Sequence, residues 1–228
     1  MWSYYGSKSK LVNLYPPPKH NKIIEPFAGS ARYSLKWFER DVLLVDKYEI
    51  IINVWRYLQS ASKKDILSLP QLKPSECVDD FDLTIIEKYL IGFCINGGSA
   101  QPKKTAQKFN VWPTTQKMIS ENLYKIKHWQ IEHKSFDEIE NQNATWFVDP
   151  PYQFGGEHYV KSNKQIDFPQ LAEWCKNRIG QTIVCENTKA DWMDFKPMKE
   201  MQGSMYKTTE TIWSNHPTNY DNIQQRLF

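Results

Sequence analysis

The sequence predicts a doubly wound α/β domain that carries a helical insertion. A short apolar strand is followed by a glycine-containing turn and a helix, within residues 22–40. A second apolar strand then ends in Asp46, and a second helical pattern follows at once. Strand, tight turn, helix, strand, acidic residue and helix in this order are typical of the first half of such a domain.

The first two strands are short, buried runs. Residues 22–25 read Lys-Ile-Ile-Glu and are stopped by Pro26, and residues 42–45 are all Val or Leu. Ser30 is expected to cap a helix from residue 31 to about 40, because a serine hydroxyl accepts a hydrogen bond from a free amide of the first turn. The second helix is expected over about residues 49–60.

Residues 61–128 are expected to form the insertion, because composition and charge change there. Residues 61–96 carry a net charge of −2 and one strong helical pattern, about 83–95. Residues 97–128 hold six lysines and a single acidic residue, a net charge of +5, with a helix expected over about 115–127. Residues 1–60 and 129–228 would then form one α/β domain.

The remaining sequence continues the α/β pattern. Strands are expected near 130–133, 145–148 and 181–186, with a helix over about 169–178 between the last two. The tail at 198–201, 204–206 and 211–214 is expected to form short strands, with Gly203 at a turn, as an antiparallel hairpin at the sheet edge.

Composition excludes several classes of protein. The chain has 228 residues and a net charge of +3, and no apolar run approaches the roughly 18 residues needed to cross a bilayer. Its first residues do not resemble a secretory signal. The four cysteines form no CxxC pair and the five histidines are scattered, which argues against a metal site and favours a reducing, cytoplasmic location.

The turn after the first strand has the features of a ligand site. Ligands of open α/β sheets bind beyond the carboxyl ends of the strands, and Gly29 allows close approach to the backbone. Asp46, at the end of the next strand, could accept both hydroxyls of a ribose. The absence of GxGxxG disfavours NAD. A structural turn beside a surface aspartate remains an alternative.

The segment Asp149-Pro150-Pro151-Tyr152 follows a buried strand and is the more specific signal. Consecutive prolines hold the preceding residues extended and lack N–H donors. The Asp149 carboxylate and the Pro150 carbonyl can therefore act as paired acceptors, with the Tyr152 ring beside them. Such a pair and a flat ring suit the exocyclic amino group of a planar base. The alternative is a proline-terminated strand with a solvated aspartate.

Three segments, residues 4–8 (YYGSK), 25–31 (EPFAGSA) and 149–152 (DPPY), make the chain resemble the Dam-type (D12 class) DNA adenine-N6 methyltransferases. This resemblance implies a Rossmann-like methyltransferase sheet with a mostly helical, basic target-recognition insertion. It also implies S-adenosylmethionine as cofactor, double-stranded DNA as partner and no metal. The chain departs from the family pattern at Ser7 and Ala31, where glycines are frequent.

The resemblance also implies roles for individual residues. The catalytic set would be Asp149, Pro150, Pro151 and Tyr152. An acidic residue often precedes the family's phenylalanine near the cofactor adenine, whereas here Ser135 precedes that residue and Asp137 follows it. The residues implied for cofactor binding are Tyr5, Lys8, Glu25, Phe27, Gly29, Asp46, Phe136, Asp137 and Asp149.

The basic insertion is the expected nucleic-acid contact. Lys103, Lys104 and Lys108 would bind phosphates, and Asn110 would read a base edge. A solvated lysine-rich face is the alternative. Two other functions stay open: methylation of an amino group in RNA, and a non-catalytic DNA-binding module with a vestigial cofactor site.

Overall fold

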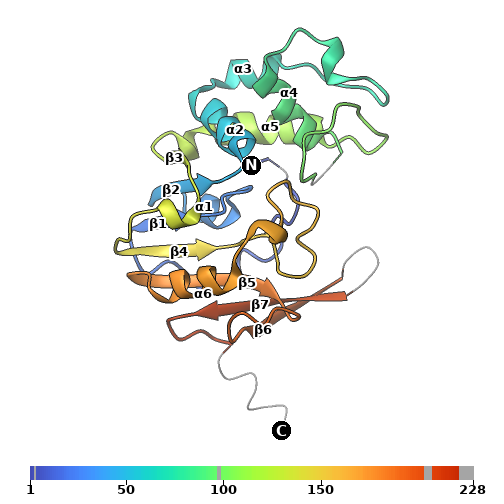
Figure 1. Ribbon diagram of the computed structural model, residues 1–228. Coiled ribbons are helices and arrows are strands. Elements are labelled where there is room, and N and C mark those ends of the chain that lie inside the picture. Colours follow the sequence, from blue (N-terminus) through green and yellow to red (C-terminus); the bar gives the residue numbers. More distant parts are fainter. Residues whose placement is uncertain (3, 97–98, 203–206, 221–228) are drawn as a thin grey trace.

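A seven-stranded sheet forms the centre of the molecule (Figure 1). The computed structural model describes residues 1–220 except 3, 97–98 and 203–206. The strand order is β3-β2-β1-β4-β5-β7-β6. The strands are β1 (Lys22–Glu25), β2 (Asp41–Asp46), β3 (Gln130–His133), β4 (Ala144–Val148), β5 (Gly180–Asn187), β6 (Lys196–Gln202) and β7 (Lys207–Ser214).

The strand directions confirm the Rossmann-like sheet. Strands β3, β2, β1, β4 and β5 are parallel, and β7 lies antiparallel between β5 and β6. The chain builds outward from β1 through β2 to β3, and then returns to place β4 on the other side of β1. The carboxyl ends of β1 and β4 therefore flank the point where the strand order reverses, which is the usual ligand site of such sheets.

The helices fall into two groups. Helices α1 (Arg32–Lys36), α2 (Glu49–Ser60) and α6 (Phe168–Lys176) flank the sheet. The segment between α2 and β3 is helical and lies beyond α2 at the top of Figure 1. It contains α3 (Lys63–Ser68), η1 (Val78–Asp80), α4 (Ile85–Cys94), α5 (Trp112–Asn122) and η2 (Leu123–Ile126), while η3 (Phe136–Glu138) and η4 (Asn163–Gln165) belong to later loops.

Alternating side chains of the strands fill a core on each face of the sheet. Ile23 and Phe147 pack on one face, and the neighbouring Ile24 and Trp146 pack on the other. The first of these cores continues without a break into the helical segment, where it includes Trp112. The helical segment is thus anchored to the α/β domain by shared apolar burial.

The structure confirms most of the expected elements and corrects three. Helix α1 is capped at Ala31, not Ser30, and ends at Lys36. Its Ser34 amide donates to the buried Glu25 carboxylate, which takes the place expected for the Ser30 hydroxyl. Helix α3 was not expected, although Ser62 and Asp65 form a capping box at its start. The strand expected at 204–206 and the turn at Gly203 lie outside the described residues.

Helix α5 begins three residues before the expected start. Pro113 lies in its first turn, where the missing N–H of proline costs nothing. The expected edge hairpin is confirmed, because β6 and β7 pair antiparallel. Across the part of the chain that the structure describes, no helix combines the length and apolar character needed to span a bilayer.

Candidate active site

The loop after β1 contains a residue, Gly29, in a left-handed backbone conformation that favours glycine. Gly29 has φ +42°, and its N–H donates to Asp46 Oδ2 at 3.1 Å. The Gly29 carbonyl accepts from the indole N–H of Trp55 at 2.9 Å. A Cβ at Gly29 would lie 3.2 Å from the Tyr4 ring, so a larger residue would crowd this wall as well as strain the turn. The loop is therefore anchored from both sides while its surface stays accessible.

Asp46 joins the loop to the end of β2. Its Oδ1 accepts from the Tyr48 N–H at 2.8 Å, and its Oδ2 accepts from Gly29. Burial raises the pKa of Asp46 to about 6, against the lowering effect of these two backbone hydrogen bonds. A carboxylate has about four acceptor positions. Asp46 therefore keeps capacity for a ligand with two adjacent hydroxyls.

Glu25 caps the start of helix α1, a structural role that the sequence did not reveal. Its carboxyl group is buried and accepts from the Ser34 N–H at 2.7 Å, which caps α1. Burial raises the pKa of Glu25 to about 8, partly offset by its hydrogen bonds to Ser34. Glu25 also lines the pocket described next.

One pocket brings together segments that are far apart in the sequence. It lies at the carboxyl ends of β1 and β4 and encloses about 940 Å³, counting the part open to solvent. Of the residues expected to bind a cofactor, eight line this pocket: Tyr5, Lys8, Glu25, Phe27, Gly29, Asp46, Phe136 and Asp149.

The walls of this pocket fit an adenosine bearing a charged side arm. Phe27 and Phe136 stack, with ring centroids 5.8 Å apart, and form an apolar wall for a flat base. Asp46 could accept hydrogen bonds from ribose hydroxyls, and the Gly29 loop would let such a ligand lie against the backbone. The donor set present in this chain is therefore suited to S-adenosylmethionine.

Asp137 is not part of this arrangement. Its side chain is exposed in η3 and does not line the pocket, whereas the preceding Phe136 is buried and does. Ser135, the residue before that phenylalanine, also lines the pocket. The turn thus presents Ser135 and Phe136 to the ligand and leaves Asp137 in solvent.

Asp149 follows β4 directly and lies at the inner end of the pocket. Its Oδ1 is 2.9 Å from Lys8 Nζ, and its side chain is 21% exposed. Burial raises the pKa of Asp149 to about 6, with Lys8 acting in the opposite direction and Glu210 adding to the rise. Asp149 and Pro151 line the pocket, so the proline-rich edge and the glycine loop face the same space.

Tyr152 faces a second cavity on the other side of Lys8. This cavity is also lined by Phe154, Asn187 and Glu210. The segment from Tyr5 to Lys8, together with Tyr159, lines both cavities and forms the partition between them. Gly6 has φ +71°, and a Cβ there would collide with the Tyr159 hydroxyl. The two cavities therefore share a wall, and Lys8 in that wall contacts Asp149.

Glu210, on β7, is the main residue that sequence reasoning missed. It is buried, and its Oε1 accepts from the Tyr152 hydroxyl at 2.7 Å and from the Tyr15 hydroxyl at 2.6 Å. Lys8 Nζ lies 3.7 Å from the same oxygen. Nothing in the polar run around Glu210 marks it in the sequence, because the sheet register alone brings β7 beside β5.

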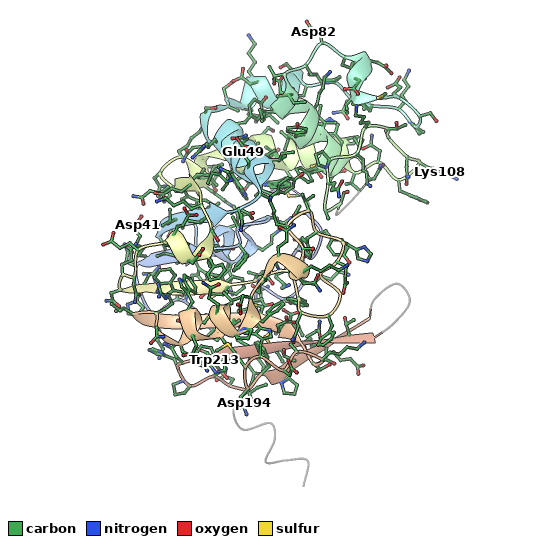
Figure 2. All side chains as sticks on the ribbon, in the orientation of Figure 1. Asp41, Glu49, Asp82, Lys108, Asp194 and Trp213 are labelled. Atoms are coloured by element: carbon green, nitrogen blue, oxygen red, sulfur yellow. The ribbon has the colours of Figure 1, made fainter. Side chains whose placement is uncertain are left out.

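The expected DNA-binding residues lie in the helical segment, outside both cavities. Lys103, Lys104 and Lys108 are exposed, and Lys108 projects from the rim of the segment (Figure 2). Lys104 pairs with Asp79 at 2.8 Å. Asn110 is held by the protein: its Nδ2 donates to the Leu72 carbonyl and its Oδ1 accepts from the Trp112 N–H. Its amide therefore serves the start of α5.

Comparison with known proteins finds weak similarities to solved structures, of which three are described here. No protein-family model and no curated sequence matches this chain. A conserved hypothetical protein from Streptococcus pyogenes has 11% identity and a TM-score of 0.35, covering 86% of this chain and 88% of that chain. A candidate methyltransferase, yhhF, from Escherichia coli has 8% identity and a TM-score of 0.34, covering 90% of this chain and 78% of that chain.

A candidate methylase from Haemophilus influenzae has 10% identity and a TM-score of 0.38, covering 86% of this chain and 80% of that chain. All three TM-scores lie below 0.5. The assignment of a Rossmann-like methyltransferase fold therefore rests on the strand order and directions of the sheet itself.

Proposed function

We propose that this chain transfers a methyl group from S-adenosylmethionine to the N6 amino group of an adenine flipped out of double-stranded DNA, at a short target sequence. The observation that carries the proposal is the single pocket lined by both the Gly29 loop and Asp149. A site for a nucleoside cofactor and an acceptor for an amino group thus open on the same space.

The residues of the chain would position the target amino group and stabilise the charge that develops on its nitrogen. Bound S-adenosylmethionine would supply an electrophilic methyl group. The adenine amino nitrogen is a weak nucleophile because its lone pair is delocalised into the ring. The Asp149 carboxylate and the Pro150 carbonyl would accept its two N–H groups, favour a tetrahedral nitrogen and stabilise the positive charge that develops there. The Asp149 carboxylate is also placed to take the proton that this nitrogen loses after methylation.

The second cavity supports entry of a base from the side opposite the cofactor. Tyr152 and Tyr159 are among the residues that line it. An adenine inside a duplex cannot reach such a cavity, so it must leave the stack at a cost of a few kcal/mol. Stacking on an aromatic side chain offsets part of that cost.

Mapping of modified adenines tests the proposal directly. The chain is expressed in cells that lack adenine methylation, and genomic DNA is sequenced with detection of modified bases. We expect N6-methyladenine within one short motif, absent from cells expressing Asp149→Ala. Methylation confined to RNA would contradict the DNA substrate. Absence of methylation from both nucleic acids, with purified protein that binds duplex, would favour the non-catalytic alternative.

The reaction is expected to depend on pH through Asp149. The ionised carboxylate would stabilise the positive charge that develops on the target nitrogen and take its proton, which the neutral acid cannot do, and the pKa of Asp149 is raised to about 6. With saturating cofactor and DNA, kcat should fall about tenfold for each pH unit below 6 and level off above about pH 7. Single-turnover methylation from pH 5 to 8.5 measures this profile. A rate that stays constant between pH 5 and 7 would contradict the role of Asp149 as an ionised acceptor.

The lysine-rich part of the helical segment is expected to control affinity for the duplex. Replacing Lys103, Lys104 and Lys108 with alanine should weaken duplex binding and make its salt dependence shallower. Each phosphate contact contributes about 0.9 to the slope of log K against log salt. Lys104 already pairs with Asp79, so we expect a change of about 2 and the smallest effect from Lys104→Ala alone.

Lys176→Ala is the matched control for this measurement, because Lys176 is a similarly exposed lysine on α6, outside the helical segment. It should leave the salt slope unchanged. An unaltered slope in the triple variant would mean that the phosphate contacts lie elsewhere on the protein.

A further inference from the structure

In this structure Lys8 occupies the position that a target amino group would need. Its Nζ is 2.9 Å from Asp149 Oδ1 and 4.5 Å from the centroid of the Tyr152 ring. It therefore covers both the acceptor and the stacking face expected to receive the base. An adenine can use this edge only if the ammonium group of Lys8 moves aside.

A buried lysine cannot simply lose its partner. The Lys8 side chain is only 9% exposed, and an uncompensated charge at such a site is strongly unfavourable. Opposing carboxylates raise its pKa, which overcomes the effect of burial and keeps the ammonium group charged. Lys8 must therefore find a second anionic partner within reach when it leaves Asp149.

Glu210 meets this requirement. Its Oε1 lies 3.7 Å from Lys8 Nζ, so a small movement completes an ion pair there. Glu210 is itself buried and is held in place by the hydroxyl groups of Tyr15 and Tyr152. It is thus a fixed second partner for the ammonium group of Lys8.

We infer that Glu210 is a positioning residue: it receives Lys8 when the target amino group arrives, and thereby frees Asp149 Oδ1 and the Tyr152 face. This inference rests on the proposed function. Loss of the Glu210 charge would leave Lys8 bound to Asp149, so the base would compete with an ion pair for the acceptor.

The charges around Asp149 allow the idea to be tested without turnover. Lys8 and Glu210 act on it most strongly, and Glu25 and Glu186 also interact with it. The neighbouring Tyr15, Tyr152, Tyr159 and Cys185 all have raised pKa values and stay neutral near pH 6. Since Glu210 raises the pKa of Asp149, Glu210→Gln should lower it.

The first measurement is the titration of the Asp149 carboxyl carbon by NMR in the full chain, without ligands. The midpoint, expected at about pH 6 in the unmodified protein, should move to lower pH in Glu210→Gln. Tyr15→Phe removes one hydrogen bond to Glu210 and leaves its charge, so it should leave the midpoint in place. A midpoint that stays or rises in Glu210→Gln would overturn the inference, whether or not the protein methylates adenine.

The second measurement is methyl transfer at pH 8.5 with saturating cofactor. We expect kcat to fall at least tenfold in Glu210→Gln and less than threefold in Tyr15→Phe, with the cofactor dissociation constant unchanged in both. Removing the obstructing lysine in the double variant Lys8→Met/Glu210→Gln should recover part of the lost rate. A double variant no faster than Glu210→Gln alone would overturn the inference, because the loss of rate would then not come from Lys8 held at Asp149. Inactive unmodified protein would instead refute the proposed function and leave the titration result valid.

Discussion

Replacing Asp149 with alanine is expected to reduce methyl transfer about a thousandfold while largely sparing cofactor binding. The carboxylate is the acceptor placed where positive charge would develop on the target nitrogen, and loss of one preorganised group of this kind costs about 10²–10³ in kcat. Most of the cofactor pocket is formed by other residues, including Phe27, Gly29 and Asp46, and these stay in place.

The Asp149→Ala protein should still fold, which makes the result interpretable. Lys8 loses one partner but keeps Glu210 at 3.7 Å, so its charge is not left isolated. Rapid-quench methylation of duplex DNA gives the rate, and calorimetric titration with S-adenosylmethionine gives the affinity. Asp149→Asn, which matches the original shape, should also be strongly impaired, because its neutral amide neither stabilises the developing positive charge as a carboxylate does nor takes the proton. Turnover equal to that of the unmodified protein would remove Asp149 from the mechanism.

Replacing Asp46 with alanine is expected to raise the cofactor dissociation constant at least about 100-fold. Two hydrogen bonds from ribose hydroxyls to a carboxylate contribute about 1.5–3 kcal/mol each. Asp46 also accepts from the amides of Gly29 and Tyr48, so its loss loosens the loop that faces the ligand. Asp46→Asn retains one acceptor oxygen and should have a smaller effect.

Asp41→Ala is the matched control for this prediction. Asp41 begins the same strand, β2, which Asp46 ends, and Figure 2 shows Asp41 at the outer rim of the molecule. Its removal should leave the dissociation constant unchanged. Since the pKa of Asp46 is raised to about 6, cofactor affinity should also weaken as the pH falls below 6. An unchanged constant in Asp46→Ala would exclude this residue from the site.

Local sequence signals predicted the elements of the sheet because each signal acts over a few residues. Apolar runs at β1 and β2, the acidic end of β2 and the helical period of α2 all appear where they were expected. The same signals failed at the start of α1. There Ser30 has the ideal capping chemistry, but the buried carboxylate of Glu25 reaches the Ser34 amide and replaces it.

The composition of the candidate site was partly predictable for the same reason. The Gly29 turn, Asp46 and Asp149 all follow strands, and parallel strands present their carboxyl ends at one edge of a sheet. Asp137 and Phe136 are adjacent in the sequence, yet only the phenylalanine faces the pocket. The direction of a side chain in a short 3₁₀ turn depends on how that turn packs, which composition does not reveal.

By itself, the sequence determined the α/β class, the glycine loop and the proline-rich edge, because each depends on the conformational preferences of neighbouring residues. Only the tertiary structure decided that Lys8 lies between Asp149 and Glu210. These three residues come from the N-terminal segment, the end of β4 and the middle of β7, and no local rule relates them. Lys8 stabilises both carboxylates, which repel each other, only once the sheet has assembled and excluded water, because burial strengthens the interactions between these charges.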